Sequence, residues 1–265
     1  MASKYNKIIE HIFHERYEPG SEKISFTRDQ LIECAEYLQI KTPKNIGDII
    51  YSFRYRTPLP KSIQITAPKG KEWIIVGEGS ANYCFQLSVK TVIEPNPYLE
   101  NIPIPNNTPE SIVMYQLSDE QSLLCKLRYN RILDIFLGLV TYSMQNHLRT
   151  TVNGIGQIEI DEIYVGINKI GQHFIIPVEA KIGKDKIGVV QTMQDIQYCK
   201  QKFPELICIP IAVHTLEGKN TLCIFRLTLE NDEVKIVDEK HYRLVYSDKI
   251  DRHDIAERNR DLTGV

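Results

Sequence analysis

The stretch from Gln157 to Tyr198 constrains the fold of this chain more than any other. Residues 157–165 alternate polar and apolar side chains, which is the period of a β-strand. Residues 173–182 form a second run of strand character, and residues 168–171 separate the two runs as a turn. Gly188 then opens a helix that has apolar side chains available for packing. This stretch therefore predicts a β-hairpin followed directly by a helix.

Charged side chains gather on one face of the predicted hairpin. Alternation places Glu159 and Asp161 together on the first strand. Glu179 and Lys181 share a face of the second strand, since residues i and i+2 of a strand point the same way. Pro177 cannot donate a ladder hydrogen bond, so it marks an edge or a bend that can aim Glu179. The hairpin is expected to set Glu179 and Lys181 beside Asp161.

These residue types suit the hydrolysis of phosphodiester bonds. Two carboxylates and the backbone carbonyl of Ala180 form an all-oxygen ligand set, which suits Mg²⁺, with Mn²⁺ as a substitute. Such an ion polarises a phosphoryl oxygen and lowers the pKa of a bound water. The ammonium group of Lys181 can orient that water, and burial can lower the pKa of a lysine. The predicted helix adds a polar stripe of Gln191, Gln194 and Tyr198, which can reach a nucleotide or support the site.

Asp161 followed by Glu179-Ala180-Lys181 resembles the motif of the PD-(D/E)XK nuclease superfamily. Gln194-Asp-Ile-Gln-Tyr198 is similar to the Gln-xxx-Tyr motif of its RecB-like branches. The runs Gln-Ile-Glu-Ile-Asp-Glu-Ile-Tyr-Val-Gly and Val-Glu-Ala-Lys-x-Gly-Lys-Asp look like type II restriction endonucleases that carry this core. The resemblance covers about residues 118–215. One departure is Ile160, which stands where the family carries Pro before the first acid.

The resemblance implies a mixed sheet flanked by helices and a magnesium-dependent phosphodiesterase. It implies that Asp161, Glu179 and the Ala180 carbonyl bind metal and that Lys181 positions the attacking water. Gln194 and Glu120 are carried over as further residues of the catalytic site. Glu159 and Glu162 flank Asp161, so the sequence leaves open which of these three acids ligates the metal.

The first 93 residues predict a second, smaller domain. Residues 5–17 have helical spacing, and Thr27-Arg-Asp-Gln30 is a capping box that opens a second helix. Thr42-Pro43 is expected to start a third helix. Two alternating runs, 62–66 and 71–76, predict a β-hairpin around the turn 67–70. Three helices followed by a hairpin is the order of a winged helix-turn-helix domain.

The third helix and the hairpin are basic, which indicates a DNA-binding surface. Asp48 is the only acid between residues 41 and 61, and Tyr51, Tyr55 and Trp73 are interleaved with the basic residues. The alternative is a solvated helix face beside an ordinary hairpin. The candidate DNA-binding residues are Lys41, Lys44, Arg54, Arg56, Lys61, Lys69 and Lys71.

The remaining segments complete the predicted domain organisation. Residues 94–112 are rich in Pro and Asn and are expected to link domain 1–93 to a nuclease domain, 113–265. Residues 80–92 can add a strand to the first domain. Ser118-Asp-Glu-Gln121 predicts the start of a long helix that Gly138 kinks or breaks, with Asn130 and Arg131 exposed. Further strands are expected at 206–213, 221–229 and 234–245, with a charged tail or short helix at 248–261. The fold class is α/β (α+β).

Composition limits the function classes. The net charge of −2 over 265 residues means that nucleic-acid binding must come from local patches. The six cysteines form no CxxC pair and suit a reducing compartment. No signal-peptide pattern and no run long enough to span a membrane occurs, so a cytoplasmic protein is expected.

The leading hypothesis is a type II restriction endonuclease that cuts double-stranded DNA at specific sequences. Cutting both strands implies a homodimer, and a restriction system implies a DNA methyltransferase that acts on the same site. One alternative is a repair nuclease or junction resolvase. The other is a winged-helix regulator without catalytic activity, which would be favoured if Asp161, Glu179 and Lys181 failed to converge.

Overall fold

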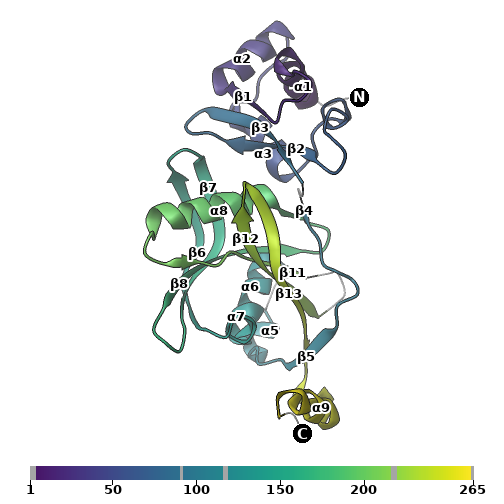
Figure 1. The fold of residues 1–265 in the computed structure, drawn as a ribbon, viewed down its shortest axis with the longest axis vertical. Coiled ribbons are helices and arrows are strands. Elements are labelled where there is room, and N and C mark those ends of the chain that lie inside the picture. The colour runs from purple at the N-terminus through teal and green to yellow at the C-terminus, as the bar shows by residue number, and fades with distance from the viewer. Residues whose placement is uncertain (1–3, 90–91, 116–118, 216–219, 264–265) are drawn as a thin grey trace.

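The protein consists of two units stacked end to end (Figure 1). The computed structural model describes residues 4–89, 92–115, 119–215 and 220–263. A smaller N-terminal unit combines helices with a three-stranded sheet, and a larger unit holds a mixed sheet flanked by helices. No helix of the described residues is long and apolar enough to cross a membrane.

The N-terminal unit is built around an antiparallel sheet with the strand order β1-β3-β2. Thr27 caps α2 as the sequence predicts, because its hydroxyl accepts from the Gln30 amide while the Gln30 side chain accepts from the Thr27 amide. The elements of this unit are α1 (Lys4–Arg16), β1 (Lys23–Thr27), α2 (Arg28–Tyr37), α3 (Gly47–Tyr55), α4 (Lys61–Gln64), β2 (Glu72–Gly77) and β3 (Asn82–Ser88).

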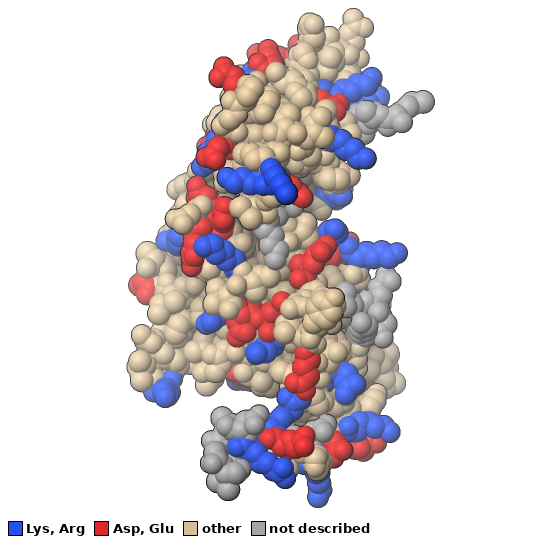
Figure 2. Space-filling model, turned by 45° about the vertical axis from the view of Figure 1, so that its right-hand side comes forward, with Lys and Arg blue, Asp and Glu red and all other residues tan. Residues whose placement is uncertain are grey.

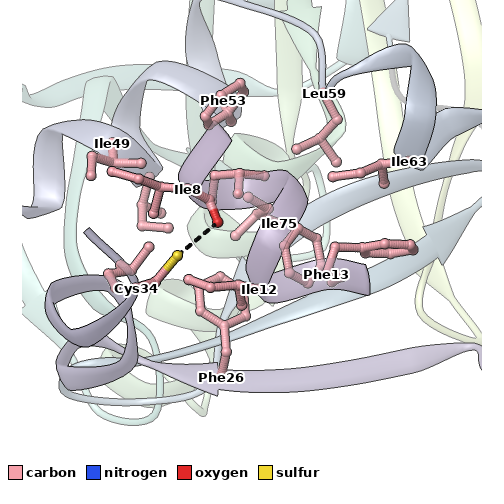
Figure 3. Close-up of a cluster of buried hydrophobic side chains, with 14 of the residues drawn as sticks. Ile8, Ile12, Phe13, Phe26, Cys34, Ile49, Phe53, Leu59, Ile63 and Ile75 are labelled. Carbon is pink, nitrogen blue, oxygen red and sulfur yellow. Dashed lines mark hydrogen bonds between the residues drawn. The ribbon is translucent and has the colours of Figure 1, made fainter. Parts of the chain in front are cut away.

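One apolar cluster holds this unit together (Figure 3). Ile8, Ile12 and Phe13 lie on one face of α1 at helical spacing and are all buried. They pack against aromatic side chains of the sheet, including Phe26 and Phe85. Burial of each such side chain contributes about 1.5–3 kcal/mol. The predicted amphipathic first helix is confirmed, and so is the extra strand expected within residues 80–92.

Two predictions for this unit are wrong. The third helix begins at Gly47 and not at Thr42-Pro43, because an Asn45 turn precedes it: the Asn45 side chain accepts from the Gly47 amide at 3.1 Å and donates to Asp48 at 2.9 Å. Residues 61–64 form the short helix α4 instead of a strand.

The side chain of Gln64 takes the place of the missing strand. Its amide group donates to the Trp73 carbonyl at 3.0 Å and accepts from the Trp73 amide at 2.9 Å, so it satisfies the edge of β2. The hairpin of this unit is therefore β2–β3, and its turn contains Glu78 and Ala81.

The large sheet of the described residues has eight strands. Its order is β5-β13-β12-β11-β8-β7-β6, with β10 beside β8. The β5–β13, β8–β10 and β8–β11 pairs are parallel and the other pairs are antiparallel. The strands are β5 (Asn101–Pro105), β6 (Val140–Val152), β7 (Gly156–Ile167), β8 (His173–Ile182), β10 (Ile207–Cys208), β11 (Ile211–Thr215), β12 (Thr221–Glu230) and β13 (Glu233–Val245).

Helices cover both faces of this sheet, as the sequence predicts. On one face, α6 (Glu120–Tyr129) and α7 (Ile132–Leu137) pack against Ile176 and Val178. On the other, α8 (Val189–Lys202) packs against Ile175 and Phe225. The remaining elements are β4 (Val92–Ile93), which pairs with β9 (Ile187–Gly188), α5 (Glu110–Val113), a short 3₁₀ turn (Ser247–Lys249) and α9 (Arg252–Thr263) near the C-terminus.

The predicted linker and the predicted long helix are corrected. Residues 101–105 of the supposed linker form β5, an edge strand of the large sheet. The described part of the long helix begins after Asp119, which caps it; Ser118 lies outside the described residues. The helix ends at Tyr129 with Asn130 as its C-cap, α7 follows, and residues 140–152 form the strand β6.

Asn130 is 2% exposed, contrary to the expectation that it is solvated. Its side-chain oxygen accepts from the Asn107 amide and its nitrogen donates to the Thr108 hydroxyl, so it fastens the segment before α5. Arg131 is exposed as expected. Its backbone has a φ of 52°, which breaks the helix at this position.

The two units are in direct contact, and α8 lies between the large sheet and the N-terminal unit (Figure 1). Ile74 and Val76 of β2 belong to an apolar cluster that is otherwise formed by the large unit, including Val190 of α8. Gly77, at the end of β2, meets Ile155 in the β6–β7 turn so closely that a Cβ at Gly77 would lie 2.4 Å from the Ile155 carbonyl oxygen.

Candidate active site

The candidate site lies where β7 and β8 separate. Their antiparallel pairing ends at Glu162 opposite Val178. Beyond this point the Ala180 amide donates to the Asp161 carboxylate at 2.8 Å instead of to a backbone carbonyl. Half-buried Glu159 and Asp161 alternate with buried Ile158 and Ile160, as the sequence predicts. The divergence of the strands therefore leaves room for acidic side chains within the sheet.

Lys181 joins the acids of this site. Its ammonium nitrogen lies 2.7 Å from Glu179 Oε1 and 3.3 Å from Glu120 Oε1, and it donates to the Ala180 carbonyl at 3.2 Å. Glu120 is in the first turn of α6, where its half-exposed side chain reaches the end of β8. The structure thus brings Asp161, Glu179, Lys181 and Glu120 together.

Burial dominates the electrostatics of the site. Glu179 is 2% exposed, and its burial raises the pKa of this carboxyl to about 8. Burial also raises the pKa of Asp161. For Lys181 burial acts to lower the pKa, but the charges of Glu179 and Asp161 outweigh it and the pKa is raised. Lys181 is therefore held protonated. This differs from the expectation from the sequence that burial lowers the pKa of this lysine.

The donor set fits a hard divalent cation. Both carboxylate oxygens of Glu179 are buried: Oε1 has the Lys181 ammonium at 2.7 Å, and Oε2 has no hydrogen-bond partner among the described residues. A buried oxygen without a partner carries a desolvation cost that an ion would remove. No group of three or more His, Cys, Asp or Glu side chains placed to hold a metal occurs among the described residues. An ion would be held by Asp161, Glu179 and the Ala180 carbonyl, which supply the oxygen ligands that Mg²⁺ prefers.

The two rival acids have other partners. Glu162 is fully buried, its two oxygens lie 3.0 and 3.3 Å from the Arg128 guanidinium, and it also accepts from Ser143. Glu159 pairs with Arg149 at 3.1 Å and with His147 at 3.1 Å. Of the three acids, Asp161 is the one whose carboxylate accepts a hydrogen bond from β8, from the Ala180 amide next to Glu179.

Gln194 is buried on α8, and its partner comes from the other unit. The Tyr55 hydroxyl of α3 donates to the Gln194 side-chain oxygen at 2.8 Å. Burial raises the pKa of Tyr55, and the charges of Glu179 and Asp195 act in the same direction. The hydroxyl therefore lies within electrostatic reach of the site. Tyr198, the last residue of the predicted polar stripe, packs edge-on against Phe203 and supports the fold.

Asp195 is a residue of the site that the sequence reasoning missed. It is 3% exposed, and its Oδ1 accepts no hydrogen bond from the described residues. Burial raises the pKa of Asp195 well above its ordinary value, and the charges of Glu179 and Asp161 raise it further. The sequence carries one signal for it: Asp195 lies between Gln194 and the apolar Ile196, and all three are buried on α8.

A cleft of about 1150 Å³ opens over the site between the two units. The large unit contributes Asp161, Lys181 and Glu120 to its lining, and the N-terminal unit contributes Tyr55 of α3 and the next residue, Arg56. The cleft gives solvent and ligands access to Asp161 and Lys181, while Glu179 lies beneath the surface.

The predicted DNA-binding residues do not form one surface. Arg54 donates to the Ile75 carbonyl at 3.1 Å, and its Nη2 is buried without a hydrogen-bond partner in the described chain; burial lowers its pKa. Arg56 lines the cleft and lies over the Tyr51 ring. Lys71 pairs with Glu22 at 3.4 Å. The exposed remainder is Lys41, Lys44, Lys61 and Lys69.

The expected basic hairpin tip is a further correction. Lys69 and Lys71 precede β2, and the turn between β2 and β3 carries Glu78 instead. Basic and acidic side chains are interspersed on the face that Figure 2 shows, over both units. A basic patch wide enough for DNA is not visible on that face.

Comparisons with protein-family models, with curated proteins and with solved structures give no match for this chain.

Proposed function

We propose that this protein is a magnesium-dependent endonuclease that hydrolyses double-stranded DNA at specific sequences, of the PD-(D/E)XK type II restriction class. The observation that carries the proposal is the convergence of Glu179, Lys181 and Asp161 where β7 and β8 separate, beneath an open cleft. Two carboxylates and an ammonium in this arrangement suit phosphodiester hydrolysis.

Each residue has a stated role in the proposal. Asp161, Glu179 and the Ala180 carbonyl would hold the ion, which supplies Lewis-acid chemistry when bound. Lys181 carries its proton at neutral pH, so it orients the attacking water by donating a hydrogen bond and stabilises negative charge on the phosphate. It does not serve as the base. Glu120 would help to hold the ammonium of Lys181, from which its Oε1 lies 3.3 Å away.

The N-terminal unit is proposed to be a winged-helix domain. The element order α1-β1-α2-α3-α4-β2-β3 supports this assignment, with α3 as the helix that reads bases, α4 as one extra helical turn, and β2–β3 as the wing. The wing turn carries Glu78 and no lysine, and the guanidinium of Arg54 in α3 is buried. The phosphate contacts of this unit would therefore come from those predicted DNA-binding cations that are exposed outside α3, which are Lys41, Lys44, Arg56, Lys61 and Lys69. Cleavage of both strands further implies a homodimer. Light scattering can measure its mass in solution.

The test is DNA cleavage by the full chain with Mg²⁺, using genomic DNA from several sources free of modification. Discrete fragments that disappear with EDTA and with Lys181→Ala are expected. Lys169→Ala is the matched control, because Lys169 is an exposed lysine in the turn at the far end of the same hairpin. Cleavage that strongly prefers four-way junctions over linear duplex would replace the restriction activity by a repair or resolvase activity, and absence of any cleavage would contradict the proposal.

A further inference from the structure

We propose that Cys208 is a peroxide-reactive cysteine and that Cys199 is its resolving partner, so that oxidation joins the two side chains in a disulfide. Cys199 lies in α8 and Cys208 lies in β10. Both are free thiols in the structure. This modification is separate from the proposed hydrolysis of DNA and can be measured without any substrate.

The chain turns back on itself between α8 and β10 and brings the two cysteines into one apolar cluster. Cys199 lies in the last turn of α8, where its carbonyl accepts from the Phe203 amide at 2.8 Å. Cys208 follows in β10, which is held by its parallel pairing with β8. Cys199 and Cys208 pack in the same cluster as Phe203 and Leu206. The two thiols therefore meet without any rearrangement of the large sheet.

The two thiols differ in their access to solvent. Cys199 is fully buried, whereas Cys208 is half-buried. A small oxidant therefore reaches the Cys208 sulfur first, and the Cys199 sulfur is held behind it. An accessible thiol that stands next to a second, resolving thiol is typical of redox-reactive cysteines.

The contact between the two thiols makes Cys208 the nucleophile. The Cys199 thiol donates to the Cys208 sulfur, which raises the pKa of Cys199 and lowers the pKa of Cys208. Burial of Cys208 acts against this lowering of its pKa, and the positive charge of Lys200 adds to it. Because the thiolate is the form that attacks an oxidant, Cys208 is the more reactive of the two.

The other cysteines lack this combination of features. Cys125 of α6 is also half-buried, but burial raises its pKa. Cys34 and Cys84 are buried, and burial raises the pKa of each to about 11. Cys223 is buried as well. Reactivity towards peroxide is therefore expected to concentrate at Cys208, with Cys125 as the natural comparison.

The reaction with hydrogen peroxide balances in two steps. The Cys208 thiolate attacks one peroxide oxygen, the O–O bond breaks, and Cys208 becomes a sulfenic acid while the released hydroxide takes up a proton. The Cys199 sulfur then loses its proton, attacks the Cys208 sulfur and expels the hydroxyl group as water. Both thiols are oxidised, the peroxide is reduced, and the products are one disulfide and two waters.

This disulfide acts on the helix that borders the candidate active site. Asp195 lies about one turn before Cys199 on α8, and both side chains are buried. The charge of Cys208 contributes to the raised pKa of Asp195, after burial and the charges of Glu179 and Asp161. Oxidation removes that charge and ties the last turn of α8 to β10.

Peptide mapping of the full chain tests the proposal directly. The reduced protein is treated with a small excess of hydrogen peroxide, the remaining thiols are blocked with N-ethylmaleimide, and a tryptic digest is examined without reduction. Trypsin cuts after Lys200 and Lys202, between the two cysteines. The expected product is a cross-link between the Cys199 and Cys208 peptides, with a mass about 2 Da below their sum because two hydrogens are lost. No cross-link, or a cross-link between other cysteines, would overturn the proposal.

Alkylation of the native, reduced protein tests the order of reactivity. Iodoacetamide at about pH 7 is expected to label Cys208 roughly tenfold or more faster than Cys125, because the thiolate fraction falls tenfold for each unit by which the pKa rises. Equal rates for the two half-buried cysteines would contradict the role of Cys208 as the nucleophile.

Three variants separate the roles of the cysteines. Cys199→Ala is expected to leave Cys208 as a sulfenic acid that dimedone traps, whereas Cys208→Ser is expected to abolish both the trapping and the cross-link. Cys125→Ser is the matched control and should form the cross-link at the wild-type rate. Dimedone trapping at Cys125 in place of Cys208 would overturn the proposal, and the map of the wild type remains decisive if a variant fails to fold.

Discussion

The Tyr55 hydroxyl donates a 2.8 Å hydrogen bond to the side-chain oxygen of Gln194, across the boundary between the two units. Gln194 is 4% exposed, and its side-chain nitrogen has no hydrogen-bond partner in the described chain. A single hydrogen bond therefore orients this amide beside the acidic cluster. The N-terminal unit thereby reaches the candidate active site.

Removal of this hydroxyl is expected to weaken the interface. Tyr55→Phe leaves the Gln194 oxygen buried and unpaired, which costs about 1–2 kcal/mol of unfolding free energy. Urea denaturation measures the loss, and Tyr98→Phe is the control because Tyr98 is 93% exposed. Equal stability of the two variants would show that the hydrogen bond contributes nothing.

Glu179 is expected to make the stability of the metal-free protein fall as the pH rises. Its pKa is about 8 in the fold and about 4.5 when unfolded, so between these values the folded state binds more protons than the unfolded state. The contribution of Glu179 is fully present below pH 4.5 and is lost as the pH rises through 8. Glu179→Gln also removes the partner of Lys181, so the test is the slope: its stability should fall less than that of the wild type as the pH rises from 4.5 to 8.

Denaturation midpoints over this pH range check the effect. Glu205→Gln, at an exposed glutamate after α8, is the control and should keep the wild-type profile. Parallel profiles for the wild type and Glu179→Gln would mean that the carboxyl is ionised throughout.

Added Mg²⁺ is expected to raise the melting temperature, and more so at pH 8 than at pH 6. A carboxyl must be deprotonated to bind a metal, and burial raises the pKa of both Asp161 and Glu179. A ligand that binds only the folded state stabilises it. Differential scanning fluorimetry measures the shift without any substrate.

Variants of Asp161 and Glu159 test which of these acids binds the metal, a question that the sequence leaves open. Asp161→Asn should abolish the Mg²⁺ shift, whereas Glu159→Gln should retain it, because Glu159 is occupied by Arg149 and His147 at the surface. If Glu159→Gln lost the shift and Asp161→Asn retained it, Glu159 and not Asp161 would be the metal ligand.

Glu162 is expected to matter for stability and not for metal binding. Glu162→Gln removes a fully buried charge that pairs with Arg128 and leaves the guanidinium poorly satisfied, which costs about 3 kcal/mol. Chemical denaturation should show this loss, while the Mg²⁺ response of the folded variant stays as in the wild type. A lost Mg²⁺ response in a stable variant would contradict this role.

Local patterns in the sequence identified most residues of the candidate site. Alternation over 157–165 and 173–182 predicted β7, β8 and the shared face of Glu179 and Lys181, because a period of two is a property of the strand itself. The helix after Gly188 and the capping box at Thr27 were predicted for the same reason, since both depend on residues within one or two turns.

Long-range contacts decided what these patterns could not show. The strand β6 has exposed residues at most of its positions, so it lacks alternation, and its extended form comes from pairing with β7. Residues 61–64 fold as a helix because Gln64 satisfies β2 in place of a strand. Asn130 is buried because it fastens a segment more than twenty positions earlier.

The sequence alone determined that Asp161, Glu179 and Lys181 fall on neighbouring strands with a helix after them. Only the tertiary structure decided that Glu162 pairs with Arg128 and that Asp195 is buried near Glu179. It also decided that Tyr55 closes the site from another unit. The physical reason is that periodicity records which way a side chain points from its own element, while its partner there depends on the packing of distant segments.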